Sequence, residues 1–485
     1  MSRTKIVATY GPACESPDVL SAMLRAGLDV ARLNVSHLDP EDLADAVKHV
    51  RDVADQAGLP VAVLADMPGP KIRCTTCDPE SFELNDDQVI ELASGSDDDV
   101  STPEKIYVKY PHLLEDVNEG EELAINDGLV LLRTESVRKD KGVLKCRVVS
   151  GGPISSRKGV SFLQSNLRVP SLTERDIAGL EAAAKAHVDF IALSFVRSAV
   201  DIREARAILA KHGGEDIPLI AKIEQHEAVD AIEEILEEAE GVMVARGDMG
   251  IEQPLERVPL LQKDIISKAN HAGRFVITAT QMLESMIVHS RPTRAEVTDV
   301  ANAILDGTDA VMLSAETAMG HDPALAVNTM DRIARTAEER IYPEDWVRRM
   351  GVMRNGADLP ELDDALARTS CRLAIDAHLD AIVCLSFFGT TGWRVARYRP
   401  DCPILAISPH ENVCRRLCIA WGVEAFFLEE ISEKTDHVSA DDLVEPVLGF
   451  FRERQLLKKG DRIAFLAGVP LHVPGGTNYL RVIEV

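Results

Sequence analysis

Eight short apolar runs, rich in β-branched residues, recur along the first two thirds of this 485-residue chain, with helical patterns between them. Such alternation of strand and helix is typical of α/β proteins with parallel sheets. Eight units predict a (β/α)8 barrel, the TIM-barrel fold, whose active site lies at the C-terminal ends of the strands. The runs are TKIVATY, LDVARLNV, PVAVLAD, DFIALSFV, PLIAKIE, GVMVARGD, RFVITATQ and DAVMLSAE.

A long insertion separates the third run from the fourth. The segment 67–158 carries short alternating strand patterns with turn signals between them, and it is far longer than one connecting helix needs. We therefore expect a small β-barrel lid domain over residues 67–158, inserted into a catalytic barrel made of residues 1–66 and 159–342. Long loops on the catalytic face of a barrel usually cover or bind the ligand.

A second α/β pattern follows the barrel. The stretch that bears Pro343, Gly351, Gly356 and Pro360 is predicted to be a linker. Three helical and three strand patterns then alternate, which predicts a C-terminal α/β domain with an open, mainly parallel sheet over residues 343–485. No catalytic constellation is evident in it, so we expect a role in regulation or assembly.

Two carboxylates and one lysine lie at the ends of neighbouring runs. Lys222 and Glu224 close the fifth run, where alternate side chains share a face, and Asp248 closes the sixth. One helix and a return strand fit between them, so the two strand ends would lie side by side. Such oxygen ligands suit Mg²⁺, which completes its coordination with water and substrate phosphate. Taken alone, these residues fit a structural salt bridge equally well.

Two further strand ends suit an anionic ligand. Arg32, Asn34 and Ser36 share one face at the end of the second run, and Arg32 offers a guanidinium fork for phosphate oxygens. Gly247 lies where the sixth run should give way to a short helix. Backbone N–H groups at a helix start bind carboxylate or phosphate, and a glycine allows close approach.

Hydroxyl groups close the last two runs. Thr280 ends the seventh run and Ser314 ends the eighth. Either hydroxyl could bond substrate or order a water molecule. Either could equally cap the helix that follows, which is a common role of serine and threonine.

The overall composition excludes several classes of function. A formal net charge of −26 and a pI near 4.9 argue against nucleic-acid binding. No apolar run approaches the length of a membrane span, and the N-terminus enters a strand directly, so no membrane association is expected. Nine cysteines at irregular spacing argue against a disulfide framework. We therefore expect a cytoplasmic protein.

The segments that hold these residues closely resemble the pyruvate kinase family. The resemblance implies magnesium-dependent transfer of the phosphoryl group of phosphoenolpyruvate to ADP, giving pyruvate and ATP in the last step of glycolysis, usually by a homotetramer. The similarity covers nearly the whole chain. The matching segments are TKIVATYGP, ARLNVSH, SSRKGV, AKIEQHEAV, MVARGDMGIE, TATQMLESMI, the run from Arg291 to Gly320, and, near the end, YRP, WGV and GGTN.

The resemblance also implies roles for the charged residues. Glu224 and Asp248 match the ligands of Mg²⁺, with Mn²⁺ as an alternative ion. Lys222 matches the cation that stabilises the phosphoryl group during transfer and the enolate left behind. Arg32 would hold the phosphoryl group. These roles agree with the physical requirement, because phosphoryl transfer needs charge neutralisation and alignment.

The resemblance further implies which residues bind the rest of the substrates. Gly247, Asp248 and Thr280 would hold the substrate carboxylate, and a water ordered by Thr280 or Ser314 would protonate the enolate. The lid would bring two basic residues to the nucleotide. The positions implied to contact nucleotide are Asn34, Ser36, His37, Arg73 and Lys158.

The chain departs from the family at its monovalent-cation site. Most members bind potassium with residues matching Asn34, Ser36, Asp66 and the carbonyl of Met67, and carry glutamate where this chain has Lys71. The motif here is DMPGPKIR, where the usual form is DTKGPEIR. An ammonium at Lys71 could supply the charge of potassium, so we expect activity without this ion. The alternative is that Lys71 faces solvent and the ion still binds.

Two other functions fit part of the pattern. A non-catalytic sensor of a phosphorylated metabolite would keep the pocket, but loss of a charged site residue would be expected, and none is lost. The site residues alone, without the family resemblance, also fit another magnesium-dependent barrel enzyme, such as an aldolase or lyase acting on a keto acid. The lid and its basic residues Arg73 and Lys158 favour a second phosphate-bearing substrate instead.

Overall fold

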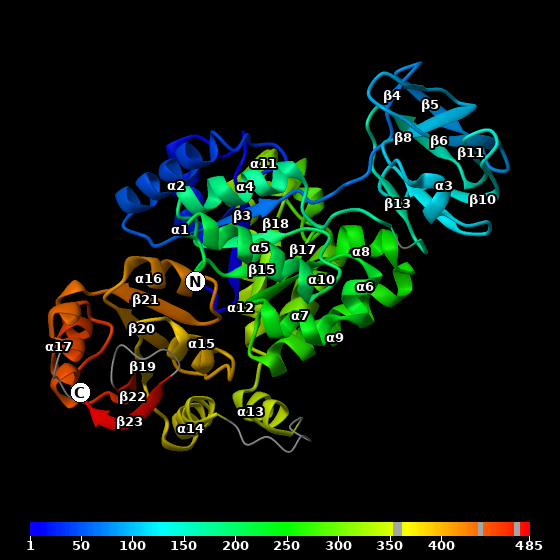
Figure 1. The fold of residues 1–485 in the computed structure, drawn as a ribbon. Helices are drawn as coiled ribbons and strands as arrows, with labels where there is room; N and C mark the ends of the chain where they lie inside the picture. The colour runs from blue at the N-terminus through cyan, green and yellow to red at the C-terminus, as the bar shows by residue number, and fades with distance from the viewer. Residues whose placement is uncertain (166, 353–360, 435–439, 470–475) are drawn as a thin grey trace.

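The structure is a computed structural model that describes residues 1–165, 167–352, 361–434, 440–469 and 476–485. A closed barrel occupies the middle of the molecule (Figure 1). A lid of β-strands stands away from one end of the barrel, and a C-terminal domain packs against its other end.

Eight parallel strands form the barrel in the order β1-β18-β17-β16-β15-β14-β3-β2. Each of the eight apolar runs forms one of these strands, so the predicted (β/α)8 barrel is confirmed. Side chains such as Val7, Phe190 and Met243 fill the interior, while alternate residues pack against the helices. The strands are β1 Lys5–Thr9, β2 Val30–Asn34, β3 Ala62–Met67, β14 Phe190–Leu193, β15 Leu219–Ile223, β16 Gly241–Ala245, β17 Phe275–Ala279 and β18 Ala310–Leu313.

Helices surround the barrel, and local signals fix where several of them begin. Thr173, Ser198 and Thr293 each form a capping box with an acidic residue three positions later. The helices are α1 Pro17–Ala26, α2 Leu43–Ala57, α4 Glu174–Lys185, α5 Ala199–Lys211, α6 His226–Asp230, α7 Ile232–Glu238, α8 Arg246–Glu252, η1 Leu255–Arg257, α9 Val258–Ala272, η2 Glu284–Ile287, α10 Arg294–Asp306, α11 Ala315–Ala318 and α12 Pro323–Glu338.

The lid is a curled six-stranded sheet in the order β13-β9-β10-β11-β6-β8, with two short strand pairs, β12-β5 and β4-β7. It has its own apolar core. Strand β13 pairs with β9, so the lid sheet includes residues beyond the expected boundary at residue 158. Its elements are β4 Thr76–Cys77, β5 Ser81–Leu84, β6 Val89–Ser94, β7 Val100–Ser101, β8 Lys105–Val108, α3 Leu113–Asp116, β9 Glu122–Ile125, β10 Val130–Arg138, β11 Val143–Ser150, β12 Gly152–Ser155 and β13 Val160–Phe162.

The C-terminal domain is an open sheet in the order β21-β20-β19-β22-β23, with helices against both faces. Among the described strands only the edge strand β23 is antiparallel, so the expected mainly parallel sheet is confirmed. The elements are α14 Leu362–Ala377, β19 Ala381–Leu385, α15 Thr390–Ala396, β20 Ile404–Ser408, α16 Glu411–Leu417, β21 Val423–Phe427, η3 Glu429–Lys434, α17 Ala440–Glu453, β22 Arg462–Gly468 and β23 Thr477–Glu484.

The expected linker is wrong in its first half. Residues Pro343–Val352 form helix α13, and the indole of Trp346 donates to the carbonyl of Arg397 at 2.8 Å. Proline at the first position of a helix is favourable, and two acidic residues follow Pro343 in the first turn. Gly356 and Pro360 lie outside the described residues.

All nine cysteines are free thiols, and all but Cys77 are buried. Across the described ranges, none of the helices combines the length and the apolar character that crossing a membrane requires.

Candidate active site at the mouth of the barrel

Lys222 is the centre of a buried polar cluster at the C-terminal end of β15. Its ammonium Nζ lies 3.0 Å from Oε1 of Glu224 and 3.4 Å from Oδ1 of Asp66, and it donates to the hydroxyl of Ser194 at 2.6 Å. Burial disfavours the charged form, but the two carboxylates outweigh it and raise the pKa of Lys222. The site therefore contains a fixed and permanent positive charge.

Glu224 is fully buried beside this charge. Its Oε2 accepts the backbone N–H of Phe195 at 2.8 Å, while Oε1 faces Lys222 as an ion pair without hydrogen-bond geometry. Burial raises the pKa of Glu224 to about 7, although Lys222 opposes the shift. A buried carboxylate oxygen that is only partly neutralised suits a bound cation.

Asp248 lies in the first turn of α8, directly after β16. Strands β15 and β16 pair in parallel, with Ile223 opposite Val244, so the ends that carry Glu224 and Asp248 are neighbours, as the spacing predicts. The Asp248 side chain is 33% exposed. In the described part of the chain no group of three or more metal-binding side chains occurs. Two carboxylates still fit Mg²⁺, which usually keeps several waters and uses one or two protein carboxylates.

Arg32 pairs with Asp66 on the adjacent strand β3. Its Nε donates to Asp66 at 2.7 Å and its Nη1 to the hydroxyl of Thr9 at 2.9 Å. Although Asp66 is buried, Lys222 and Arg32 hold the pKa of its carboxyl below the usual range. These contacts fix one edge of the guanidinium. The Nη2 nitrogen makes no hydrogen bond within the described ranges, so it remains able to bind an anion.

Gly247 and Thr280 contact each other at the ends of β16 and β17. The backbone N–H of Gly247 donates to the Thr280 hydroxyl at 2.8 Å, and that hydroxyl donates to the carbonyl of Ala279 at 2.7 Å. The Gly247 N–H is therefore not available to a ligand in this conformation. Thr280 has φ +70°, which is unusual for a β-branched residue. Arg246 holds it there by donating to the Thr280 carbonyl at 2.7 Å.

Ser314 directly precedes helix α11, but its hydroxyl makes no capping hydrogen bond to that helix. Its backbone N–H donates to Glu316 at 2.6 Å. The other Glu316 oxygen accepts the N–H of Leu283 at 3.1 Å. Of the two readings of Ser314, capping is therefore wrong, and the hydroxyl is left for other partners.

The residues matched to nucleotide binding fall into two groups. On the barrel, Asn34 Oδ1 accepts the N–H of Ser36 at 3.1 Å, and His37 is exposed. On the lid, Arg73 lies opposite Gly159, and Lys158 accepts the N–H of Cys74 at 2.9 Å, so both basic residues sit on adjacent lid segments. Among the described residues, no hydrogen bond or ion pair joins the two groups. The lid stands away from the barrel mouth (Figure 1).

Sequence reasoning missed the turn after β14. The Ser194 hydroxyl accepts from Lys222 and donates to the carbonyl of Met67 at 2.7 Å. Phe195, at φ +56°, directs its N–H at Glu224. This turn therefore holds both the ammonium and the carboxylate. The available signal was the place of Ser194 at the end of the fourth apolar run.

Lys71 points from the lid hinge toward the barrel. Its Nζ lies 3.6 Å from Oδ1 of Asp248 and 3.5 Å from Oδ1 of Asp127 in the lid, and its side chain is 32% exposed. The alternative in which Lys71 faces only solvent does not match this position. Two of the oxygens expected to bind potassium, on Asp66 and Met67, already have partners, as described above.

Fold and site together define a lidded (β/α)8-barrel enzyme with a lysine and two carboxylates at the C-terminal ends of adjacent strands. The family model described as pyruvate kinase, barrel domain, matches residues 1–327, and the one described as pyruvate kinase, alpha/beta domain, matches residues 364–483. The chain belongs to the pyruvate kinase family.

Similar proteins span the whole chain. A pyruvate kinase of Geobacillus stearothermophilus is 41% identical over 481 residues, which cover 99% of this chain and 80% of the relative. One of Clostridium acetobutylicum is 38% identical over 99% of each chain. A crystal structure of a pyruvate kinase from Cryptosporidium parvum aligns with a TM-score of 0.91 at 32% identity, covering 100% of this chain and 96% of that one.

Proposed function

We propose that this chain transfers the phosphoryl group of phosphoenolpyruvate to ADP, giving pyruvate and ATP. Family membership over the full length supports the proposal. The observation that carries it is the ammonium of Lys222, fixed beside Glu224 at the mouth of the barrel. The comparisons give no support to a non-catalytic sensor. Pyruvate release from phosphoenolpyruvate, measured with purified chain, ADP and Mg²⁺, tests the proposal, and its absence would refute it.

Charge neutralisation is the main task of the site. The P–O bond to the enol oxygen breaks while a bond to a β-phosphate oxygen of ADP forms, so negative charge must be stabilised throughout. Lys222 offsets it on the phosphoryl group and then on the enolate, and the unused edge of Arg32 holds the phosphoryl oxygens. Glu224 and Asp248 would hold Mg²⁺ or Mn²⁺, which supplies further positive charge to the phosphate oxygens.

The remaining residues are proposed to bind the substrate carboxylate and the nucleotide and to help protonate the enolate. Thr280, Asp248 and the α8 start that Gly247 opens would hold the substrate carboxylate, after the Gly247–Thr280 hydrogen bond rearranges. The enolate carbon takes a proton from a water held by the hydroxyl of Thr280 or Ser314. Lid closure would bring Arg73 and Lys158 toward the barrel residues Asn34, Ser36 and His37. We propose that these five residues contact the nucleotide.

We also propose that the enzyme works without potassium. The ammonium of Lys71 lies near Asp248. The Asp66 carboxylate, which was expected to bind potassium, contacts Arg32 and Lys222, and the Met67 carbonyl accepts a hydrogen bond from Ser194. The Lys71 side chain thus already supplies a positive charge next to Asp248, at the mouth of the barrel. The alternative ion site would use Asn34, Ser36, Asp66 and the Met67 carbonyl.

Replacing potassium with sodium or tetramethylammonium is expected to change the rate of pyruvate formation by less than about tenfold, which is 1.4 kcal/mol of barrier. Lys71→Glu is expected to make the enzyme depend on potassium, because it restores the carboxylate of the usual motif. Lys141→Glu makes the same charge change on an exposed lid hairpin and serves as the control. A larger loss in the wild type without potassium would contradict the proposal.

Ser194 is proposed to position Lys222. Removing its hydroxyl in Ser194→Ala should lower kcat about tenfold or more, because a hydrogen bond to a charged group is lost. The KM for ADP should stay close to the wild-type value, because Ser194 lies at the ammonium and not on the lid. Steady-state kinetics separate the two constants. If the apparent loss of kcat only reflects a smaller fraction of folded protein, and the folded fraction is fully active, Ser194 has a structural role only.

Assembly and location are further proposals. We propose a homotetramer, supported by large apolar side chains that are strongly exposed on or next to two pairs of contacting elements, η1 with α9 and η2 with α11. These side chains are Leu255, Leu260, Val288 and Met319. We propose a cytoplasmic location, which the nine free thiols support.

A further inference from the structure

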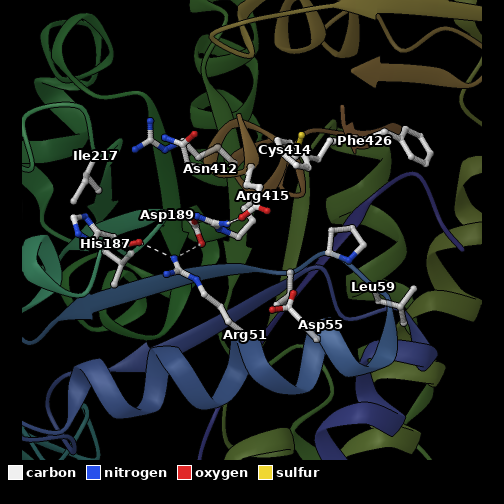
Figure 2. A pocket seen from close by; sticks show the side chains of 18 of the residues that line it. Arg51, Asp55, Leu59, His187, Asp189, Ile217, Asn412, Cys414, Arg415 and Phe426 are labelled. Atoms are coloured by element: carbon white, nitrogen blue, oxygen red, sulfur yellow. Dashed lines mark hydrogen bonds and ion pairs between the residues drawn. The ribbon is translucent and has the colours of Figure 1, made fainter. Parts of the chain in front are cut away.

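Strand β14 is anchored at its N-terminal end. Asp189 directly precedes the strand, and its buried carboxylate lies 3.4 Å from Arg51 of α2 and 2.9 Å from Arg415 of the C-terminal domain. Figure 2 shows these two guanidinium groups meeting at Asp189 from different domains. The same carboxylate accepts the backbone N–H of Val63, in β3, at 2.8 Å. Movement at this end of β14 is therefore opposed, whereas the other end continues into the turn of residues 194–197.

Two segments connect the lid to the barrel, and the first lies against this turn. Residues 68–71 lead from β3 toward the lid. Gly69 has φ +67°, and a Cβ atom there would lie 2.7 Å from Cδ2 of Phe195 and 3.0 Å from Cβ of Ser194. Its N–H donates to Oδ1 of Asp176, in the first turn of α4, at 2.9 Å. Both the backbone conformation and the close approach to the turn therefore favour glycine at this position.

Arg197 binds the second connection, residues 167–171, which leads from β13 toward α4. Its Nη1 donates to the carbonyl of Leu167 at 3.1 Å and its Nη2 to the carbonyl of Val169 at 2.7 Å. Its backbone N–H donates to Asp201 at 2.7 Å, which holds Arg197 next to the start of α5. A guanidinium fork binds two acceptors in a fixed geometry that the single ammonium of lysine does not reproduce. The second connection is therefore fixed to the same turn as the first.

The turn also holds two charged groups of the candidate active site. The Ser194 hydroxyl accepts from Lys222 at 2.6 Å, and the N–H of Phe195 donates to Glu224 at 2.8 Å. Phe195 has φ +56°, a sparsely populated conformation that persists where the surrounding contacts maintain it. Because a close-packed interior transmits displacement, a shift of either lid connection reaches both charged groups through this turn.

We propose that Arg197 is a positioning residue for Lys222 and Glu224. It holds the second connection on the turn that orients both groups, so the position of the lid and the placement of the ammonium and the carboxylate are set together. Within the described ranges, no hydrogen bond or ion pair joins Arg197 to either group, so it acts through the turn. This inference rests on the proposed function, because it gives the position of the lid a role in the geometry of phosphoryl transfer.

Hydrogen exchange of the full-length protein, followed by mass spectrometry of peptides that contain Gly69 and Phe195, tests the link without catalysis. Both backbone N–H groups donate to a carboxylate and should exchange slowly in the wild type. Arg197→Gln should raise both exchange rates at least about tenfold, because hydrogen bonds from a charged group are lost. Arg203→Gln removes an exposed arginine of α5 that pairs with Glu238, and should leave both rates unchanged.

Steady-state kinetics show whether the link reaches the reaction. Arg197→Gln should lower kcat about tenfold or more and also raise the KM for ADP at least about threefold, because it loosens both the turn and the lid. Ser194→Ala, by contrast, is expected to lower kcat alone. Arg197→Lys keeps the charge and one donor, so its KM for ADP should lie between those of Arg197→Gln and the wild type. A smaller folded fraction would lower the apparent kcat but leave the KM for ADP unchanged.

Gly69→Ala approaches the turn from the first connection and covers the case in which Arg197→Gln does not fold. Its Cβ atom would push against Phe195, so the N–H of Phe195 should exchange at least about tenfold faster. Gly142→Ala, in a lid hairpin, is the matched control. Gly142 has φ +69°, but no atom lies within 4 Å of the added Cβ, so exchange at Phe195 should stay at the wild-type rate.

The proposal is overturned if Arg197→Gln and Gly69→Ala both leave the exchange of Phe195 at the wild-type rate. It is also overturned if Arg197→Gln lowers kcat without raising the KM for ADP. A wild-type chain that forms no pyruvate would refute the proposed function alone, and the exchange measurements would still decide this inference.

Discussion

Replacing Lys222 with methionine is expected to lower kcat about a thousandfold or more. Methionine keeps much of the side-chain volume but removes the ammonium that contacts Asp66, Glu224 and Ser194 together. One donor aimed at developing charge in a water-excluded site is already worth a hundredfold to a thousandfold in kcat, and an ammonium acts on both the phosphoryl group and the enolate. The loss should fall on kcat rather than on the KM for ADP.

The variant must be shown to be folded, because the change leaves Glu224 buried without its counter-ion. We expect Glu224 to respond by taking up a proton, since its pKa is already raised to about 7 in the presence of Lys222. Circular dichroism and the melting temperature show whether the variant is folded. Lys268→Met, on the exposed side of α9, is the matched control and should keep wild-type rates. A folded Lys222→Met enzyme with near wild-type kcat would contradict the assignment.

Glu224→Gln is expected to be the second most damaging change. Glutamine has the same shape and can still accept the N–H of Phe195, so the turn after β14 should hold. It removes the negative charge that we propose as one of two metal ligands. The concentration of Mg²⁺ needed for half-maximal rate should rise at least about tenfold, and kcat at saturating Mg²⁺ should still fall, because Lys222 loses a partner.

Initial rates of pyruvate formation across a range of Mg²⁺ concentrations measure both effects. Glu237→Gln, at the end of the surface helix α7, makes the same chemical change away from the site and should behave as the wild type. If Glu224→Gln keeps the Mg²⁺ dependence and the kcat of the wild type, the Glu224 carboxylate does not bind the metal and is not needed for the reaction.

The sequence predicts the barrel and the pairing of its functional residues because both depend on local pattern. A strand buried on both faces must be apolar throughout, so each polar side chain at its end is conspicuous. Lys222, Glu224 and Asp248 are found in this way, and parallel pairing of β15 with β16 then places the last two on adjacent strand ends.

The remaining features depend on contacts between distant segments. Ser194 reaches Met67 across 127 positions of the chain, and the N–H of Gly247 is taken by Thr280, 33 positions later. No spacing rule predicts either hydrogen bond. The helix at Pro343–Val352 was missed for a different reason, because proline and glycine in it resemble a linker until the burial of Trp346 is known.

Binding of Mn²⁺ to the nucleotide-free enzyme, measured by loss of the electron paramagnetic resonance signal of the free ion, tests whether Glu224 and Asp248 hold the metal. The wild type and Glu237→Gln should bind the ion alike, whereas Glu224→Gln and Asp248→Asn should each bind it at least about tenfold more weakly. If both site variants retain the affinity of the wild type, the two carboxylates do not hold the metal, and the proposed mechanism is wrong.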